Sequence, residues 1–167
     1  MKIGVPKEIK PQETRIGLTP ESVKTLVGEG HEVLVENNGG YEAGFDNSHY
    51  ISAGAKIIDK AEDIFNDSEI IVKVKEPLLN EVKMIRENQI LFTYLHLAAA
   101  KELTQGLINS KGVCIAYETV TDQNGGLPLL APMSAVAGRM SIQEGAHCLE
   151  KNQGGEGLLL GGAPGVE

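Results

Sequence analysis

Short apolar runs alternate with helix-favouring stretches over most of the chain. The apolar runs predict strands at residues 2–5, 31–36, 55–58, 69–75, 89–97 and 113–120, because each is short and rich in residues that favour strands. The intervening stretches predict helices at residues 20–29, 61–65, 79–86 and 98–109. Strands separated by helices imply parallel crossovers. The predicted fold class is therefore α/β, a mainly parallel flavodoxin-like or Rossmann-like sheet with helices on both faces.

The helix at residues 20–29 has clear boundary signals in the sequence. Thr19 is suited to cap its N-terminus, Pro20 occupies the first helical position, and Glu21 lies in the first turn. Gly30 follows the last helical residue and can end the helix. These signals fix one crossover between two of the predicted strands.

The pattern changes from Pro132 onwards, where a single long helix is predicted to reach Asn152. Its apolar stripe contains Met133, Val136 and Met140, which recur at helical spacing. A helix of ~20 residues spans ~30 Å and suits a bridge between two domains. We therefore expect a domain over residues 1–131, an interdomain helix over 132–153, and a glycine-rich linker over 154–167.

The glycine-rich segment invites comparison with a phosphate-binding loop, which its spacing does not match. After Gly155 and Gly157, the third glycine of that motif would fall at position 160, where Leu160 stands. No predicted strand leads into the segment. A connection to a further domain and a disordered tail are the two interpretations that remain.

The charge and composition of the chain reduce the number of plausible binding partners. The net charge is −8, which argues against nucleic acid and against an anionic membrane surface. No stretch approaches the ~20 apolar residues of a membrane helix, and no signal peptide is visible, so a cytoplasmic location is expected. Cys114 and Cys148 lack metal-ligand spacing. We expect both to be reduced packing residues, and we expect no metal site.

Charged and titratable residues follow several predicted strands. Arg15 lies in the loop after the first strand, Lys75 and His96 end the next strong strands, and Glu118 lies near the end of the last. Ligands of parallel sheets bind outside the carboxyl ends of the strands. Arg15 can bind a carboxylate through two hydrogen bonds, Lys75 can donate to a carboxylate or carbonyl oxygen, and His96 can transfer protons near neutral pH. Together they suit a small 2-oxo or 2-amino acid.

Each of these residues also has an ordinary structural interpretation. Arg15 could be a solvated loop charge, and His96 a satisfied histidine within an apolar run. Lys75 shares its predicted strand face with Lys73, so both could face solvent. Glu118 could serve structure alone. The residues by themselves leave these alternatives open.

Several segments resemble one known family. The opening Ile3-Gly4-Val5-Pro6-Lys7-Glu8 and the segment Glu13-Thr14-Arg15-Ile16-Gly17 resemble the start of alanine dehydrogenases and of the related nicotinamide nucleotide transhydrogenases. Four later segments resemble the dehydrogenases, and the likeness extends over essentially the whole chain. They are Val72-Lys73-Val74-Lys75-Glu76-Pro77, Phe92-Thr93-Tyr94-Leu95-His96-Leu97-Ala98, Ser134-Ala135-Val136-Ala137-Gly138-Arg139-Met140-Ser141 and Leu160-Gly161-Gly162-Ala163-Pro164-Gly165-Val166.

The resemblance implies roles for four residues. Substrate-binding positions fall on Arg15 and Lys75, the proton-transfer histidine falls on His96, and Met133 matches a position close to substrate and nicotinamide. It further implies an oxidoreductase that converts L-alanine, NAD and water to pyruvate, ammonium and NADH, and that assembles as a homo-hexamer at full length. The family's nucleotide-binding fingerprint does not occur in these 167 residues, so we expect them to be inactive alone.

Two other functions remain as alternatives. The chain could be the nucleotide-binding component of a transhydrogenase, although relatives of that kind typically lack the Lys and His found at positions 75 and 96. It could also be a non-catalytic binding module.

Overall fold

The computed structural model of the chain describes residues 1–165. Six strands form one sheet in the order β3-β2-β1-β4-β5-β6, and every neighbouring pair is parallel. The strands are β1 (Lys2–Val5), β2 (Glu32–Glu36), β3 (Lys56–Ile58), β4 (Ile70–Val72), β5 (Ile90–Thr93) and β6 (Val113–Ala116). This is the strand order of the Rossmann-type doubly wound fold, which confirms the predicted fold class.

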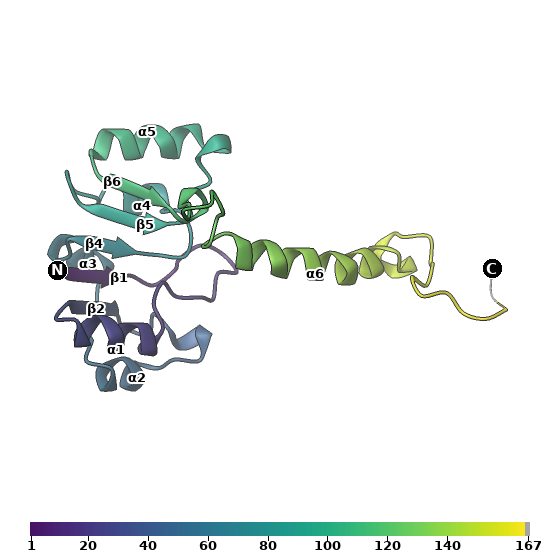
Figure 1. Ribbon diagram of the computed structural model, residues 1–167, viewed down its shortest axis with the longest axis horizontal. Helices are drawn as coiled ribbons and strands as arrows, with labels where there is room; N and C mark the ends of the chain where they lie inside the picture. Colours follow the sequence, from purple (N-terminus) through teal and green to yellow (C-terminus); the bar gives the residue numbers. More distant parts are fainter. Residues whose placement is uncertain (166–167) are drawn as a thin grey trace. The chain divides into compact units, whose positions relative to one another are not determined.

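Helices connect the strands and cover the sheet. Figure 1 shows the strands side by side, with α1 and α2 at the β2 end of the sheet and α5 at the β6 end. The helices of this part are α1 (Pro20–Gly28), α2 (Asn47–Ser52), α3 (Ala61–Asp67), α4 (Leu79–Val82) and α5 (Lys101–Ser110), with short 3-10 turns η1 (Tyr41–Ala43), η2 (Leu97–Ala99) and η3 (Tyr117–Thr119).

Two apolar cores lie on opposite faces of the sheet. Val33 and Val35 of β2 belong to one core, together with residues of α1 and α2. Leu34, between them, belongs to the other core, which includes Ile64 of α3 and Leu107 of α5. Successive side chains of a strand point to opposite faces, so the continuous apolar runs in the sequence reflect strands that are covered on both sides.

The predicted boundary of α1 is confirmed in detail. Thr19 accepts a hydrogen bond from the backbone N–H of Ser22 at 3.3 Å, and Pro20 opens the helix. Beyond the helix Gly30 has a φ of +86°, a conformation that favours glycine. The chain therefore turns sharply into β2 at this residue.

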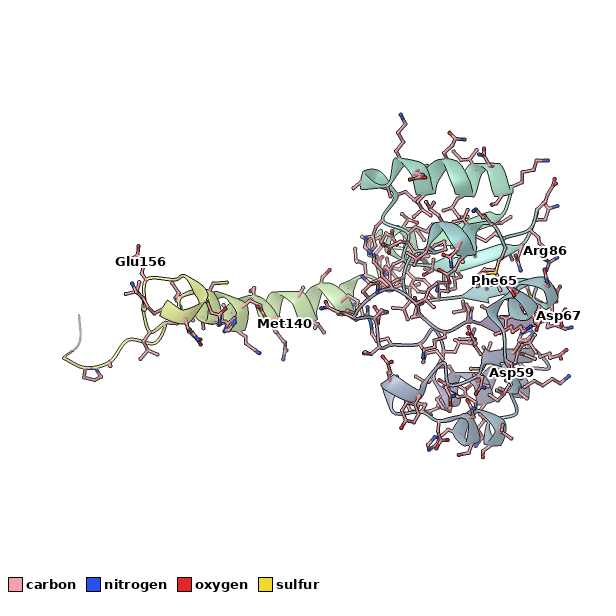
Figure 2. All side chains as sticks on the ribbon, turned by 180° about the vertical axis from the view of Figure 1, so that it is seen from behind. Asp59, Phe65, Asp67, Arg86, Met140 and Glu156 are labelled. Atoms are coloured by element: carbon pink, nitrogen blue, oxygen red, sulfur yellow. The ribbon has the colours of Figure 1, made fainter. Side chains whose placement is uncertain are left out.

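At the amino edge of the sheet, two side chains satisfy the C-terminal carbonyl groups of α3. Arg86 donates to the backbone oxygen of Ser68 at 2.6 Å, and Gln89 donates to that of Phe65 at 2.7 Å. Figure 2 shows Arg86 beside Phe65 and Asp67. Carbonyl groups at a helix end lack intrahelical partners, so these contacts fix α3 against the strand that follows.

A second compact unit begins at Val120. It contains α6 (Ala131–Cys148), on which Figure 2 labels Met140, and the 3-10 turn η4 (Lys151–Gln153). None of the residues of α6 is buried, and Met133, Val136 and Met140 are exposed. The expected long helix is thus present, and its role as an interdomain bridge stays a prediction. The last two positions of the expected linker, 166 and 167, lie outside the described residues.

Several elements differ from the sequence-based expectation. The strands expected at residues 69–75, 89–97 and 113–120 end earlier, at Val72, Thr93 and Ala116. Helix α2 was not expected. Its N-cap is Asp46, which accepts a hydrogen bond from the backbone N–H of His49 at 3.2 Å. The ring of His49 in turn accepts one from the backbone N–H of Asp46 at 3.2 Å.

Candidate functional site

The strand order reverses direction between β1 and β4 at the centre of the sheet. Strands β1, β2 and β3 run outward on one side, and β4, β5 and β6 run outward on the other. Connections at such a point leave in opposite directions and open a crevice at the carboxyl ends of the strands, where ligands of this fold class bind. The loops after β1, β4 and β5 contain Arg15, Lys75 and His96.

A buried ionic cluster lies beneath this point. The ammonium of Lys73, just after β4, lies 3.2 Å from a carboxylate oxygen of Glu8 and 2.8 Å from one of Glu81. Each of the three side chains is at most 3% exposed. The alternative in which Lys73 faces solvent is therefore wrong. The loop after β1 and helix α4 each supply a carboxylate that compensates its buried charge.

Glu8 also holds the turn that contains Lys75. Its Oε1 accepts hydrogen bonds from the backbone N–H groups of Val74 at 2.6 Å and of Lys75 at 3.2 Å. From the other side, the hydroxyl of Thr93 donates to the backbone oxygen of Lys75 at 2.9 Å. The backbone of Lys75 is thus fixed by residues from β1's loop and from β5, while its side chain is half-buried.

Arg15 forms a bidentate ion pair with Glu13 in the loop after β1. Its Nε lies 2.8 Å from Oε1, and its Nη2 lies 2.7 Å from Oε2. The hydrogen bonds from Arg15 lower the pKa of Glu13 to about 2, against the opposing effect of burial, and the Lys75 ammonium contributes to the same lowering. Two cations from separate loops therefore act on a single carboxylate.

Close packing holds the Arg15 loop against the end of β4. A Cβ atom built on Gly17 would lie only 2.6 Å from the backbone oxygen of Val72. Ile16, beside it, is buried in the core on the α1 face of the sheet. A residue with a side chain at position 17 would force the loop away from the strand.

His96 follows β5 in a constrained backbone conformation. Its φ is +49° and its ψ is 40°, a left-handed geometry that costs about 1–3 kcal/mol in a residue other than glycine. Glu118, after β6, accepts hydrogen bonds from the backbone N–H of His96 at 2.8 Å and of Leu95 at 3.0 Å. The imidazole is exposed and stacks on the ring of Tyr94, with centroids 6.0 Å apart and planes 15° apart.

The three predicted site residues are linked through their neighbours. Strands β4 and β5, which precede Lys75 and His96, are parallel neighbours as expected. The ammonium of Lys75 acts electrostatically on Glu13, the ion-pair partner of Arg15. Tyr94, which stacks on His96, also acts electrostatically on Arg15. The assignment of these residues to a substrate site stays a prediction, although their loops meet at one edge of the sheet.

Sequence reasoning missed the supporting residues Glu8, Glu13, Lys73 and Tyr94. Glu8 and Lys73 are 65 positions apart, so no local pattern could reveal their contact. The spacing of Glu13 and Arg15 did carry a signal, because two opposite charges two positions apart in a loop are within reach of each other.

A shallow hollow adjoins His96 on its β6 side. Its lining is mostly apolar, and the polar groups in it come from three residues. The lining consists of Leu95, His96, Leu97, Ala98, Ala99, Ala116, Glu118 and Thr119. One side of His96 thus faces small apolar side chains, while the other stacks on Tyr94.

The described residues do not form a dinucleotide cradle. In folds of this class the first turn after β1 carries several glycines, which allow the backbone to approach a pyrophosphate. Here the connection from Pro6 to Thr19 contains one glycine, Gly17, and it packs on β4. No step that involves NAD is therefore assigned to these residues. Within residues 1–165, no cluster of His, Cys, Asp or Glu suits a metal ion.

Two further sequence-based assignments concern the second unit and the cysteines. Met133 lies on α6, where it is 38% exposed, and its expected place near substrate and nicotinamide stays a prediction. Cys114 is half-buried, and burial raises its pKa, in agreement with a packing role. Cys148 is exposed, which does not fit the packing role expected for it.

Fold and site together define a class, a Rossmann-type α/β domain whose switch point carries two cations and a histidine. The chain belongs to the alanine dehydrogenase/PNT N-terminal domain family, whose model matches residues 4–137. It is 55% identical over 166 residues to an alanine dehydrogenase of Halomonas elongata and 52% identical over 167 residues to one of Methanococcus maripaludis. The alignments cover 99% and 100% of the chain, and 45% of each relative.

Solved structures agree with this placement. An L-alanine dehydrogenase superposes with a TM-score of 0.88 at 55% identity, covering all of this chain and 46% of that one. A transhydrogenase from Sinorhizobium meliloti gives 0.68 at 24% identity, over 74% of this chain and 36% of that one, a likeness of fold alone. The chain thus spans less than half the length of the alanine dehydrogenases it matches. None of the helices in residues 1–165 is long and apolar enough to cross a membrane.

Proposed function

We propose that this chain forms the substrate-binding portion of an NAD-dependent L-alanine dehydrogenase, which converts L-alanine, NAD and water to pyruvate, ammonium and NADH. The observation that carries the proposal is the presence of two cations in the loops after the neighbouring strands β1 and β4: Arg15 pairs with Glu13 at 2.7 Å, and the ammonium of Lys75 acts electrostatically on the same carboxylate. Two cations at one edge of the sheet can bind the carboxylate of an amino acid or an oxo acid through charge-assisted hydrogen bonds. The relatives named alanine dehydrogenase support the same substrate class.

In the proposed mechanism, Arg15 binds the substrate carboxylate through its planar guanidinium. Lys75 donates a hydrogen bond to the carboxylate or to the carbonyl oxygen and polarises the carbonyl. Both residues hold the reacting carbon at a fixed place beside the sheet. Hydride transfer is the chemistry of NAD, whose binding we assign to residues beyond this chain.

His96 is the proposed general acid and base. In the direction of deamination, its imidazole removes a proton from the water that adds to the imino acid, and it then moves a proton to the departing nitrogen. Its exposure and its stacking on Tyr94 support this role, because a proton-transfer group must reach both substrate and solvent.

A chimaera tests the proposal. In it, these 167 residues replace the matching segment of the Halomonas elongata alanine dehydrogenase, and the unmodified Halomonas enzyme serves as the control. We expect L-alanine-dependent formation of NADH. A folded chimaera that binds NAD without oxidising L-alanine would contradict the proposal, and hydride exchange between two nicotinamide nucleotides would favour the transhydrogenase alternative.

Two variants of the chimaera separate the proposed roles. His96→Ala should lower mainly kcat, by about 10²–10⁴. Arg15→Ala should also raise KM for L-alanine, because a carboxylate contact acts in both the ground state and the transition state. If His96→Ala keeps near-normal kcat between about pH 6 and 10, a range that brackets the ordinary histidine pKa, the proton-transfer role is wrong.

A further inference from the structure

A carboxylate holds the turn at Lys75 and the turn at His96 in the same way, and we call this arrangement a carboxylate clamp. Each turn follows a strand of the sheet, and in each a carboxylate from a neighbouring loop accepts two consecutive backbone N–H groups. Glu8 accepts those of Val74 and Lys75. Glu118 accepts those of Leu95 and His96.

The clamp at His96 has a further feature that its counterpart lacks. His96 has a φ of +49°, whereas the φ of Lys75 is not positive. A residue other than glycine keeps such a backbone conformation only where its surroundings hold it there. Glu118 supplies the contacts that do so on the β6 side, since its Oε1 lies 2.8 Å from the His96 nitrogen and 3.0 Å from the Leu95 nitrogen.

We propose that Glu118 is a positioning residue for His96, holding its backbone left-handed so that the imidazole stands beside Tyr94 at the edge of the sheet. This inference rests on the proposed function, in which His96 transfers protons. Glu118 holds the backbone of His96 through hydrogen bonds, and its charge also acts electrostatically on His96.

The ionisation of the Glu118 carboxylate is consistent with this positioning role. Burial opposes ionisation, but hydrogen bonds from the backbone of His96, of Glu118 itself and of Leu95, together with the electrostatic effect of His96, lower the pKa of Glu118. The same N–H groups can bind a neutral amide oxygen. Glutamine therefore preserves the geometry of the clamp while removing its charge, whereas alanine removes both.

The test compares Glu118→Gln and Glu118→Ala in the chimaera, with the exposed Glu102→Gln on α5 as the matched surface control. One measurement is kcat and KM for L-alanine across pH. The other is hydrogen exchange by mass spectrometry of the peptide containing Leu95 and His96. Melting temperatures identify any variant that fails to fold.

We expect Glu118→Ala to lower kcat at least tenfold with a smaller change in KM, and to increase amide exchange at Leu95 and His96. Glu118→Gln should keep most of both properties, and Glu102→Gln should match the parent. Loss of activity in Glu118→Gln with amide protection intact would overturn the proposal, because the charge and not the positioning would then matter. Parent-like kcat in Glu118→Ala would overturn it as well.

Hydrogen exchange distinguishes this inference from the proposed function. If the parent chimaera oxidises no L-alanine, the proposed function fails. Unchanged exchange at Leu95 and His96 in Glu118→Ala, in contrast, refutes the clamp whatever the substrate.

Discussion

The ion pair between Glu13 and Arg15 makes stability depend on pH at the scale of a single residue. The pKa of Glu13 falls from an ordinary 4.5 to about 2 in the folded chain. Because the folded value lies below the unfolded one, the carboxylate stabilises the fold fully above about pH 4.5 and loses this effect as the pH falls through about 2.

Replacement of Glu13 by Gln should therefore show a pH-dependent cost. The difference in unfolding free energy between the parent and Glu13→Gln should stay constant from pH 7 down to about 5, and then shrink towards about pH 2. Urea denaturation at several pH values measures this. Thr14→Ala removes no titratable group, so its difference from the parent should not vary in the same way. An equal cost of Glu13→Gln at pH 3 and pH 6 would refute the prediction.

Lys73 offers a second test at this scale. Lys73→Met would leave the buried carboxylates of Glu8 and Glu81 without their cation. Breaking a buried ion pair by removing one partner costs about 3–5 kcal/mol, and denaturant unfolding should show a loss of that size. The exposed Lys83, changed in the same way, should stay within about 0.5 kcal/mol of the parent. A similarly small effect at Lys73 would mean that the cluster is not the compensated charge network described above.

At the scale of elements, the packing of the Arg15 loop on β4 makes its own prediction. Gly17→Ala places a Cβ 2.6 Å from a backbone oxygen of β4, so the loop must shift, at a cost of about 1–3 kcal/mol. Arg15 moves with it, and KM for L-alanine in the chimaera should rise. Gly28→Ala is the matched control, since nothing lies within 4 Å of the added atom. At the end of α1 it should be neutral or stabilising by up to about 1 kcal/mol. An unchanged KM in Gly17→Ala would contradict the packing argument.

The same elements show what sequence reasoning could reach. Apolar runs and the cap at Thr19 predicted the alternation of strands and helices, because both signals are local. The end of β4 was placed too late. The apolar alternation continues to Val74, and hydrogen bonds to β5 also reach Val74, whose backbone oxygen accepts from Tyr94 at 3.3 Å. The N–H groups of Val74 and Lys75, however, bind Glu8 and make no strand pairing. Such a partner lies far away in the sequence and leaves no mark on the local pattern.

Helix α2 was missed for a different reason. It has six residues, too few to establish an apolar period. Its signal lay in Asp46, a residue type favoured at helix N-caps, and in His49, which completes the reciprocal hydrogen bonds. The helix N-cap signal alone, without an apolar period, is sufficient to predict α2.

At the scale of the whole molecule, the sheet order brings the three loops together. β4 pairs with β1 although α1, α2 and α3 separate them in the sequence, and this pairing sets Lys75 beside the loop that holds Arg15. β5 pairs with the other side of β4, so the loop after β5, which contains His96, lies next to the loop that contains Lys75. The proposed site therefore depends on strand order, and carboxylates from neighbouring loops hold the backbone of two of its residues, Lys75 and His96.

The final prediction concerns the 167 residues on their own. They should show no measurable oxidation of L-alanine with NAD, because the turn after β1 is no dinucleotide cradle and the glycine-rich segment has Leu160 where a third glycine is needed. Placing two reactants against each other can supply about 7–11 kcal/mol of a barrier, and nothing described in residues 1–165 places a nicotinamide. Pyruvate should still bind weakly through Arg15 and Lys75, which isothermal titration can detect, and Arg15→Ala should abolish that binding. The chimaera should regain turnover. Alanine-dependent NADH formation by the 167 residues alone would show that a nicotinamide site exists within them. It would refute the proposal that this chain binds the substrate while other residues of the enzyme bind NAD.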